Sequence, residues 1–278
     1  MADLSRTTGA RVDLLDADAM RSAVDEARPE VVYHLAARAH VGRSWHEPGL
    51  TLQDNLTMTL HVLEAVRLVA PDATVVAVSS GEVYGPPASL PVGEDAALRP
   101  QNPYAVSKAG SDLLAGFYAD AHALRVVRPR AFNHAGPGQA PVYAIATFAR
   151  QVAVGLEADD DPIRVVTGNP DTRRDYTDVR DVVRAYRELA DRGETGAIYN
   201  VCSSRPASAT ELVSWLGEAA GRDIDHVIDP ALVRAHEVLE LRGSYAKLSA
   251  VTGWEPRIPL ATTLADTVAW WRKQLAGD

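Results

Sequence analysis

The sequence predicts an α/β fold built on a parallel β-sheet, and two observations lead to this prediction. The first is the apolar, β-branched run at residues 75–78, which ends in Ser79, Ser80 and Gly81. A buried parallel strand has this pattern where its carboxyl end opens into a cleft. The second is the order of the chain, in which such short runs alternate with segments of helical periodicity. We therefore expect helices to cover the sheet.

The elements follow one another along the whole chain. Residues 11–14 and 30–36 are predicted strands, and 16–27 between them is a predicted helix with Asp16 as its N-cap. A helix over 49–68 follows, because its apolar residues Leu52, Leu56, Leu60, Leu63 and Val66 fall on or near one stripe. Further strands are expected at 124–129, 163–167, 197–202 and near 226–228, and further helices at 179–192 (capped by Asp178), 208–220 and 260–275.

A third predicted helix, over about 102–121, carries the residues with the clearest chemistry. Asn102 and Pro103 are typical of an N-cap and a first helical position. Tyr104 and Lys108 are four residues apart and therefore project from the same face. A neighbouring cation is expected to lower the pKa of a phenol, which would let Tyr104 exchange a proton at neutral pH. With Ser80 across the cleft, this set suits reduction of a carbonyl or oxidation of an alcohol with a nicotinamide cofactor.

Composition excludes several classes of protein. The formal net charge of −9 argues against a nucleic-acid-binding surface. The single cysteine, Cys202, excludes internal disulfides and fits a reducing compartment. No apolar run approaches membrane-spanning length, and the first residues do not resemble a signal peptide. We therefore predict a soluble cytoplasmic protein with no nucleic-acid or membrane partner and, from the His and Cys spacing, no metal site.

Two loops contain polar residues that suit ligand binding. Residues 128–139 place Asn133 among glycines and prolines, which is typical of a loop whose backbone comes close to a ligand or to another segment. Residues 168–181 place Arg174 beside Asp175 on a predicted turn. Such a pair can be a surface ion pair that contributes little to stability. Alternatively, the guanidinium can bind a diphosphate through bidentate hydrogen bonds to its oxygens.

The segments 79–85 (Ser-Ser-Gly-Glu-Val-Tyr-Gly) and 102–108 (Asn-Pro-Tyr-Ala-Val-Ser-Lys) resemble the nucleotide-sugar branch of the extended short-chain dehydrogenase/reductase superfamily. The resemblance implies a Rossmann-type doubly wound parallel sheet with a smaller carboxyl-terminal α/β substrate-binding domain. It assigns 1–132 and 178–202 to the dinucleotide-binding domain, and 133–177 and 203–278 to the sugar-nucleotide-binding domain. Members of the superfamily begin with a glycine-rich strand–helix–strand, and no such motif opens this sequence. We therefore expect that this first element is missing, through a truncation or a mis-called start.

The resemblance also implies roles for individual residues. Ser80, Tyr104 and Lys108 are the implied catalytic residues, and Lys108 also holds the cofactor ribose. The implied cofactor contacts are Asp13, Leu14, Leu35, Ala36, Ala37, Tyr104 and Lys108. The implied substrate contacts are Asn133, Arg174, Arg234 and Glu237. An arginine often found in relatives two positions before Arg234 is Leu232 here, which puts phosphate binding by that segment in doubt.

Within this branch the sequence is most similar to the GDP-4-keto-6-deoxy-D-mannose reductases, through segments that include 79–85, 132–139 and 173–183. This similarity implies that NADPH, or possibly NADH, reduces the C4 ketone of a GDP-sugar to give GDP-D-rhamnose, in a homodimer. The alternative is a GDP-mannose 4,6-dehydratase or another epimerase/dehydratase, in which Glu82 would remove the C5 proton. Gly81 favours the reductase, because the dehydratases carry a hydroxyl residue there. A non-catalytic protein that binds a sugar nucleotide is the second alternative.

Overall fold

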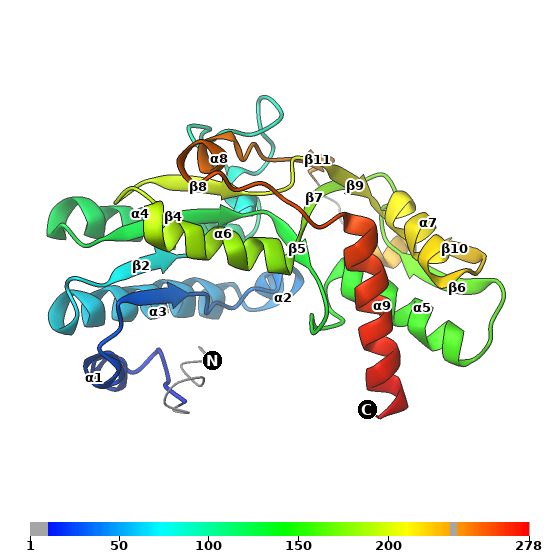
Figure 1. Ribbon diagram of the computed structural model, residues 1–278, viewed down its shortest axis with the longest axis horizontal. Helices are drawn as coiled ribbons and strands as arrows, with labels where there is room; N and C mark the ends of the chain where they lie inside the picture. The colour runs from blue at the N-terminus through cyan, green and yellow to red at the C-terminus, as the bar shows by residue number, and fades with distance from the viewer. Residues whose placement is uncertain (1–10, 234–237, 278) are drawn as a thin grey trace.

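The computed structural model describes residues 11–233 and 238–277, and Figure 1 shows its ribbon. Its larger sheet is parallel and follows the order β1–β2–β4–β8, with the short β3 beside the carboxyl end of β4. The strands are β1 (Val31–His34), β2 (Thr74–Ala77), β3 (Ser79–Ser80), β4 (Val126–Ala131) and β8 (Ile198–Val201). β3 continues the path of β2 after Val78, so the predicted central strand is present with one interruption.

Both faces of this sheet are covered by helices. Alternate residues of each strand point to opposite faces, so neighbouring residues pack against different helices. Val75 and Val126 belong to the apolar cluster that contains residues of α1, α3 and α4, whereas Val76 and Val127 belong to the cluster of α6 and α8. The bounds are α1 (Ala17–Ala27), α3 (Pro48–Val69), α4 (Pro103–His122), α6 (Val179–Arg192) and α8 (Ala246–Thr252). The predicted α/β fold with a covered parallel sheet is confirmed.

A second group of elements lies beyond the carboxyl ends of these strands (Figure 1). Its strands are β5 (Asn133–Ala135), β6 (Ile163–Thr167), β7 (Arg173–Asp178), β9 (Pro206–Ser208), β10 (Ile224–Ile228) and β11 (Glu240–Leu241). β6 pairs with β10, and β7 pairs with β5, β9 and β11. The helices α5 (Ala144–Glu157), α7 (Ala209–Ala220) and α9 (Leu260–Ala276) share one apolar core.

Three predicted helix N-caps are confirmed. Asp16 accepts a hydrogen bond from the Asp18 backbone N–H at 3.0 Å, and Asn102 accepts one from Ala105 at 2.8 Å. Asp178 accepts one from Arg180, also at 2.8 Å. A side-chain oxygen at these positions satisfies an amide that would otherwise lack a partner in the first turn.

Two predictions at the amino end are confirmed only in part. The predicted strand over 11–14 is reduced, among the described residues, to a β-bridge residue at Val12, because the chain turns at Asp13, whose carbonyl accepts from the Asp16 N–H at 3.1 Å. The predicted helix over 49–68 is present as α3, and its apolar stripe is only partly buried, since Leu56 and Leu60 remain 36% and 38% exposed. Prediction also missed the short helix α2 (Val41–His46), the helix α5 and the strand β7.

The outer edge of the larger sheet is formed by β1, which among the described residues pairs with β2 alone. Its side chains differ by face. His34 is 5% exposed, whereas Tyr33 is 40% exposed and Leu35, directly after the strand, is 58% exposed. None of the helices within the described ranges is long and apolar enough to cross a membrane.

Candidate active site

The candidate site lies where β3 ends and α4 begins. Ser80 is buried, and its Oγ accepts a hydrogen bond from the backbone N–H of Glu82 at 3.2 Å. This contact caps η1 (Gly81–Tyr84), the 3₁₀ turn that carries the chain away from the sheet. Gly81 packs closely there, because a Cβ at this position would lie 3.0 Å from the ring of Phe132, closer than ordinary van der Waals contact. The tight turn therefore holds Ser80 and Glu82 at the carboxyl edge of the sheet.

Tyr104 lies close enough to Ser80 for the two side chains to interact, and it keeps part of its surface open. Burial raises its pKa to about 12, with a further rise from the charge of Glu82, while the Ser80 contact opposes the shift. The prediction that a cation would lower this pKa is wrong for the structure without ligands, because loss of water outweighs the other effects. At neutral pH the phenol is therefore protonated and suited to donate a proton.

Lys108 lies one helical turn after Tyr104 and is 4% exposed. Its ammonium donates a hydrogen bond to the backbone carbonyl of Val78, at the break between β2 and β3. Burial lowers the pKa of Lys108 to about 8, and the nearby carboxylate of Asp112 opposes this shift. An ammonium has three N–H groups, so Lys108 can still donate to a ligand.

Glu82 faces the same site. Its Oε2 accepts a hydrogen bond from the side-chain amide of Asn102 at 3.4 Å, which ties η1 to the start of α4. Its charge raises the pKa of both Tyr104 and Tyr176. Glu82 is therefore close to the proton-transfer groups, where the dehydratase alternative expects it.

The second group of elements brings further polar side chains to this site. Asn133 on β5 lies opposite Tyr176 on β7, and the two side chains are hydrogen-bonded. Arg174 is half-buried and donates to the carbonyls of Arg173 at 3.0 Å and Val238 at 2.7 Å. Within residues 11–233 and 238–277 no carboxylate forms an ion pair with it. A phosphate could therefore take its remaining donors.

Two aromatic residues near the site were not predicted. Tyr143 interacts electrostatically with Tyr104, and Tyr176 interacts with Glu82. The aromatic position after Arg174 and Asp175 was a usable signal for Tyr176, whereas Tyr143 has none in its local sequence. The predicted substrate residues Arg234 and Glu237 lie outside the described residues.

The predicted cofactor residues divide between the surface and the core. Leu35 and Asp13 are exposed, Ala36 and Ala37 are half-buried, and Leu14 is buried. His34 interacts electrostatically with Lys108, which shows that the end of β1 lies near the catalytic helix. Leu35 to Ala37 directly follow it along the chain, and two of these three residues have small side chains. This arrangement suits close approach of a dinucleotide.

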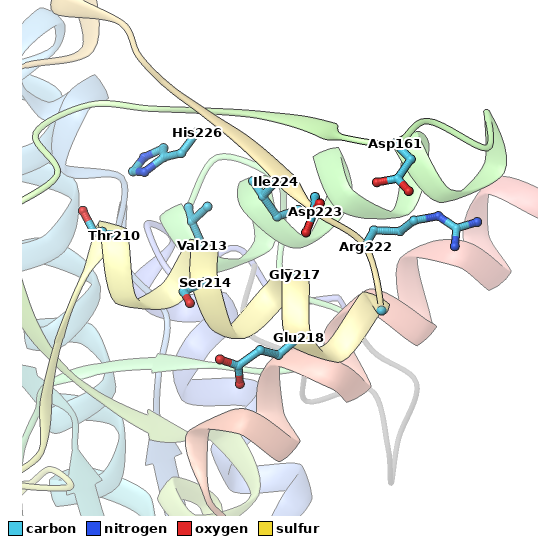
Figure 2. A pocket seen from close by; sticks show the side chains of 11 residues that line it. Asp161, Thr210, Val213, Ser214, Gly217, Glu218, Arg222, Asp223, Ile224 and His226 are labelled. Carbon is cyan, nitrogen blue, oxygen red and sulfur yellow. The ribbon is translucent and has the colours of Figure 1, made fainter.

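A separate hollow of about 620 Å³ lies between α7 and β10 (Figure 2). Thr210, Ser214 and Glu218 line it from α7, and His226 lines it from β10. None of the predicted site residues belongs to this hollow, and its Arg222 already pairs with Asp159 at 2.7 Å. The part of the chain described here holds no group of three His, Cys, Asp or Glu residues arranged to bind a metal.

Comparison with known proteins identifies the family. The family model described as "GDP-mannose 4,6 dehydratase" matches residues 3–267. The chain belongs to this family. The predicted resemblance to nucleotide-sugar enzymes of the extended short-chain dehydrogenase/reductase type is thereby confirmed, and with it the Rossmann-type fold.

Individual relatives have related activities. The chain is 38% identical over 270 residues to the GDP-6-deoxy-D-mannose reductase of Pseudomonas aeruginosa, covering 95% of this chain and 87% of that protein. It is 27% identical over 289 residues to the GDP-mannose 4,6-dehydratase of Vibrio cholerae, covering 92% and 76%. The solved structure of RMD from Pseudomonas aeruginosa complexed with NADPH matches with a TM-score of 0.89 at 37% identity, covering 95% of this chain and 88% of that one.

Proposed function

We propose that this protein reduces the C4 ketone of GDP-4-keto-6-deoxy-D-mannose to give GDP-D-rhamnose, with NADPH as the reductant. One observation carries the proposal: a protonated Tyr104, next to Ser80, stands one turn from the buried ammonium of Lys108. The similarity to the Pseudomonas reductase, which covers most of both chains, supports the choice of substrate. NADH is the alternative reductant.

In the proposed reaction, Ser80 and Tyr104 both donate hydrogen bonds to the C4 carbonyl oxygen and so polarise it. Tyr104 gives its phenolic proton to that oxygen as C4 becomes a secondary alcohol. The positive charge of Lys108 then stabilises the phenolate until solvent returns a proton. Asn133 and Arg174 would bind the sugar nucleotide, the arginine through phosphate oxygens.

The described residues fit a nicotinamide dinucleotide at its ribose and nicotinamide end. Lys108 has unused donors for ribose hydroxyls, and the small side chains of Ala36 and Ala37 would let a dinucleotide approach the backbone closely. Asp13 and Leu14 would lie against the adenine. A bound nicotinamide would supply the hydride that reaches C4.

The packing around Gly81 favours reduction over dehydration. Phe132 fills the space beside Gly81, so the hydroxyl residue that the dehydratases carry here would meet its ring at about 3.0 Å. Glu82 nevertheless stands close to Tyr104, which is the one observation that supports the dehydratase alternative. A non-catalytic sugar-nucleotide-binding protein would not need Ser80, Tyr104 and Lys108 together.

We further propose that the protein is a cytoplasmic homodimer without nucleic-acid or membrane partners. α3 and α4 pack side by side and leave Leu60, Leu113 and Phe117 at least 38% exposed. Covering such side chains with a second copy is favourable. Light scattering should then give twice the 29.9 kDa of one chain. Residues 1–132 and 178–202 would bind the dinucleotide, and 133–177 and 203–278 the sugar nucleotide.

Cofactor consumption distinguishes the activities. The purified protein is mixed with NADPH and either GDP-4-keto-6-deoxy-D-mannose or GDP-mannose. A reductase oxidises one NADPH for each keto sugar converted, whereas a dehydratase converts GDP-mannose with no net oxidation. Saturable NADPH binding in a fluorescence titration, with neither substrate converted, would instead support the non-catalytic alternative.

A further inference from the structure

Helix α4 carries a third ionisable residue on the same face as Tyr104 and Lys108. Asp112 follows Lys108 by four residues, which places it one turn further along α4. It is 2% exposed, so its carboxylate is shielded from solvent, and it interacts electrostatically with the ammonium of Lys108. None of the roles considered so far uses this residue.

The contacts of Asp112 are incomplete. Its Oδ2 accepts a hydrogen bond from Nη2 of Arg130 at 2.6 Å, and Arg128 approaches the same oxygen to 3.9 Å. Its Oδ1 is buried and has no hydrogen-bond partner among the described residues. A buried carboxylate oxygen without a partner is costly, so such a group calls for an explanation beyond packing.

Arg130 is fixed by contacts independent of Asp112. It lies on β4, is 3% exposed, and donates from Nη1 to the hydroxyl of Tyr84 at 3.0 Å. Its guanidinium also stands 5.0 Å from the centre of the Tyr84 ring. Tyr84 in turn donates to Oδ1 of Asn200 at 2.7 Å. Arg130 therefore holds a fixed positive charge beside Asp112.

The charged and titratable groups around Lys108 come from four elements. Asp112 and Tyr104 share its helix, His34 faces it from β1, Arg128 and Arg130 reach Asp112 from β4, and Glu82 stands on η1. Burial lowers the pKa of His34 to about 3, so this ring is neutral at pH 7. Asp112 is thus the acidic group that favours the charged form of Lys108.

We propose that Asp112 is a positioning residue for Lys108: its buried carboxylate keeps the lysine charged, and Arg130 limits that effect by neutralising part of the carboxylate. The proposal rests on the proposed function for its purpose, because Lys108 acts on Tyr104 and the ribose only as an ammonium. The geometric claim about Asp112 and Lys108 can be tested without substrate.

The chain is well suited to a direct measurement, because it has three lysines, Lys108, Lys247 and Lys273. Lys247 and Lys273 are exposed, on α8 and α9. In protein labelled with ¹³C at lysine Cε, a pH titration by NMR follows all three ammonium groups at once. The two exposed lysines are internal controls, and Lys108→Met identifies the third signal.

Two variants should move the Lys108 titration in opposite directions. Asp112→Asn removes the negative charge and should raise the proton-dissociation constant of Lys108 about tenfold or more. Arg130→Met leaves Asp112 unneutralised and should lower that constant. Asp181→Asn is the matched control, because Asp181 is also buried and paired with an arginine, on α6; it should leave Lys108 unchanged.

Each single variant leaves one buried charge without its partner and can destabilise the fold. The double variant Asp112→Asn/Arg130→Met removes both charges and should fold, with Lys108 shifted in the same direction as in Asp112→Asn but by a smaller amount, because the opposing charge of Arg130 is lost as well. The proposal is overturned if the Lys108 titration of the folded Asp112→Asn variant stays at its wild-type position. It is also overturned if the titration moves in the same direction in Asp112→Asn and in Arg130→Met.

Kinetics distinguish this proposal from the proposed function. If the protein reduces the keto sugar, the alkaline limb of the pH profile of kcat/KM should move with the NMR titration in each variant. A purely structural role for Asp112 would lower the activity at every pH without moving that limb. If wild-type protein shows no reduction, the proposed function fails, and the NMR result still decides whether Asp112 acts on Lys108.

Discussion

Two neighbouring regions of the molecule differ in burial: Ser80, Lys108 and Asp112 are at most 7% exposed, whereas Leu35, directly after the edge strand β1, is 58% exposed. The regions are neighbours, since His34 directly precedes Leu35 and interacts with Lys108. The proton-transfer side is held by contacts between β3, η1, α4 and β4. The side proposed to bind the cofactor follows an edge strand with one paired neighbour among the described residues.

This difference indicates that proton transfer and cofactor binding depend on separate sets of contacts. Burial already sets the protonation of Tyr104 and Lys108 without a ligand. The proposed cofactor surface, in contrast, includes the exposed side chains of Asp13 and Leu35, which would gain contacts if a dinucleotide covered them. Substitutions should therefore affect chemistry and cofactor affinity independently, and four changes test this separation.

The largest effect is expected from Tyr104→Phe. Removing the phenolic hydroxyl removes the proton donor, and loss of a general acid costs about 10²- to 10⁴-fold in rate. Because the ring remains, the dissociation constant of NADPH should change little. Steady-state reduction of the keto sugar and a fluorescence titration with NADPH measure the two quantities. Equal losses of activity and of cofactor affinity would show that the two sides are not separable.

Gly81→Ala tests the packing that holds the proton-transfer side. The new methyl group would lie 3.0 Å from the Phe132 ring, and overpacking of this kind costs about 1–3 kcal/mol in the free energy of unfolding. Urea denaturation measures this cost. Gly49→Ala on α3 is the matched control, because its Cβ would meet no atom within 4 Å. A loss no larger than that of the control would mean that Phe132 can move aside.

The parts of the structure that could be predicted from sequence are those fixed by local contacts. Asp16, Asn102 and Asp178 cap helices through amides two or three residues away, and Tyr104 and Lys108 share a face because of helical spacing alone. The strand β7 was predicted as a turn, since Arg173–Asp178 is largely charged. It is a strand because β5, β9 and β11 pair with it.

The burial of the site residues and their contacts with residues distant in sequence could not be predicted in the same way. The pKa of Tyr104 depends on the loss of water around it, which no local pattern reports. Arg130 reaches Asp112 from a different element, 18 residues along the chain. Pairing of this kind follows from the packing of α4 on β4, so only the structure reveals it.

His34→Gln tests the buried face of the edge strand. The pKa of His34 falls from 6.5 to about 3 on folding. Below about pH 6.5 the unfolded chain therefore binds a proton at this residue, whereas the folded protein binds it only below about pH 3. The wild type should therefore lose about 1.4 kcal/mol of stability between about pH 7.5 and pH 5.5 through this group. Gln keeps a donor and acceptor for Thr59 but cannot titrate. Urea denaturation at both pH values should show a smaller loss in the variant; parallel losses would contradict a buried, neutral His34.

The smallest effect on stability is expected from Leu35→Ser, at the exposed end of the same strand. Because Leu35 is 58% exposed, the free energy of unfolding should change by less than about 0.5 kcal/mol. If the side chain packs on the dinucleotide, its loss should cost about 1 kcal/mol of binding, or about fivefold in the Kd of NADPH. Leu68→Ser on α3 is the control, as its leucine is 51% exposed and distant from the predicted cofactor residues in sequence. An unchanged Kd with unchanged stability would remove Leu35 from the cofactor site and confine the cofactor contacts to Ala36, Ala37 and the catalytic helix.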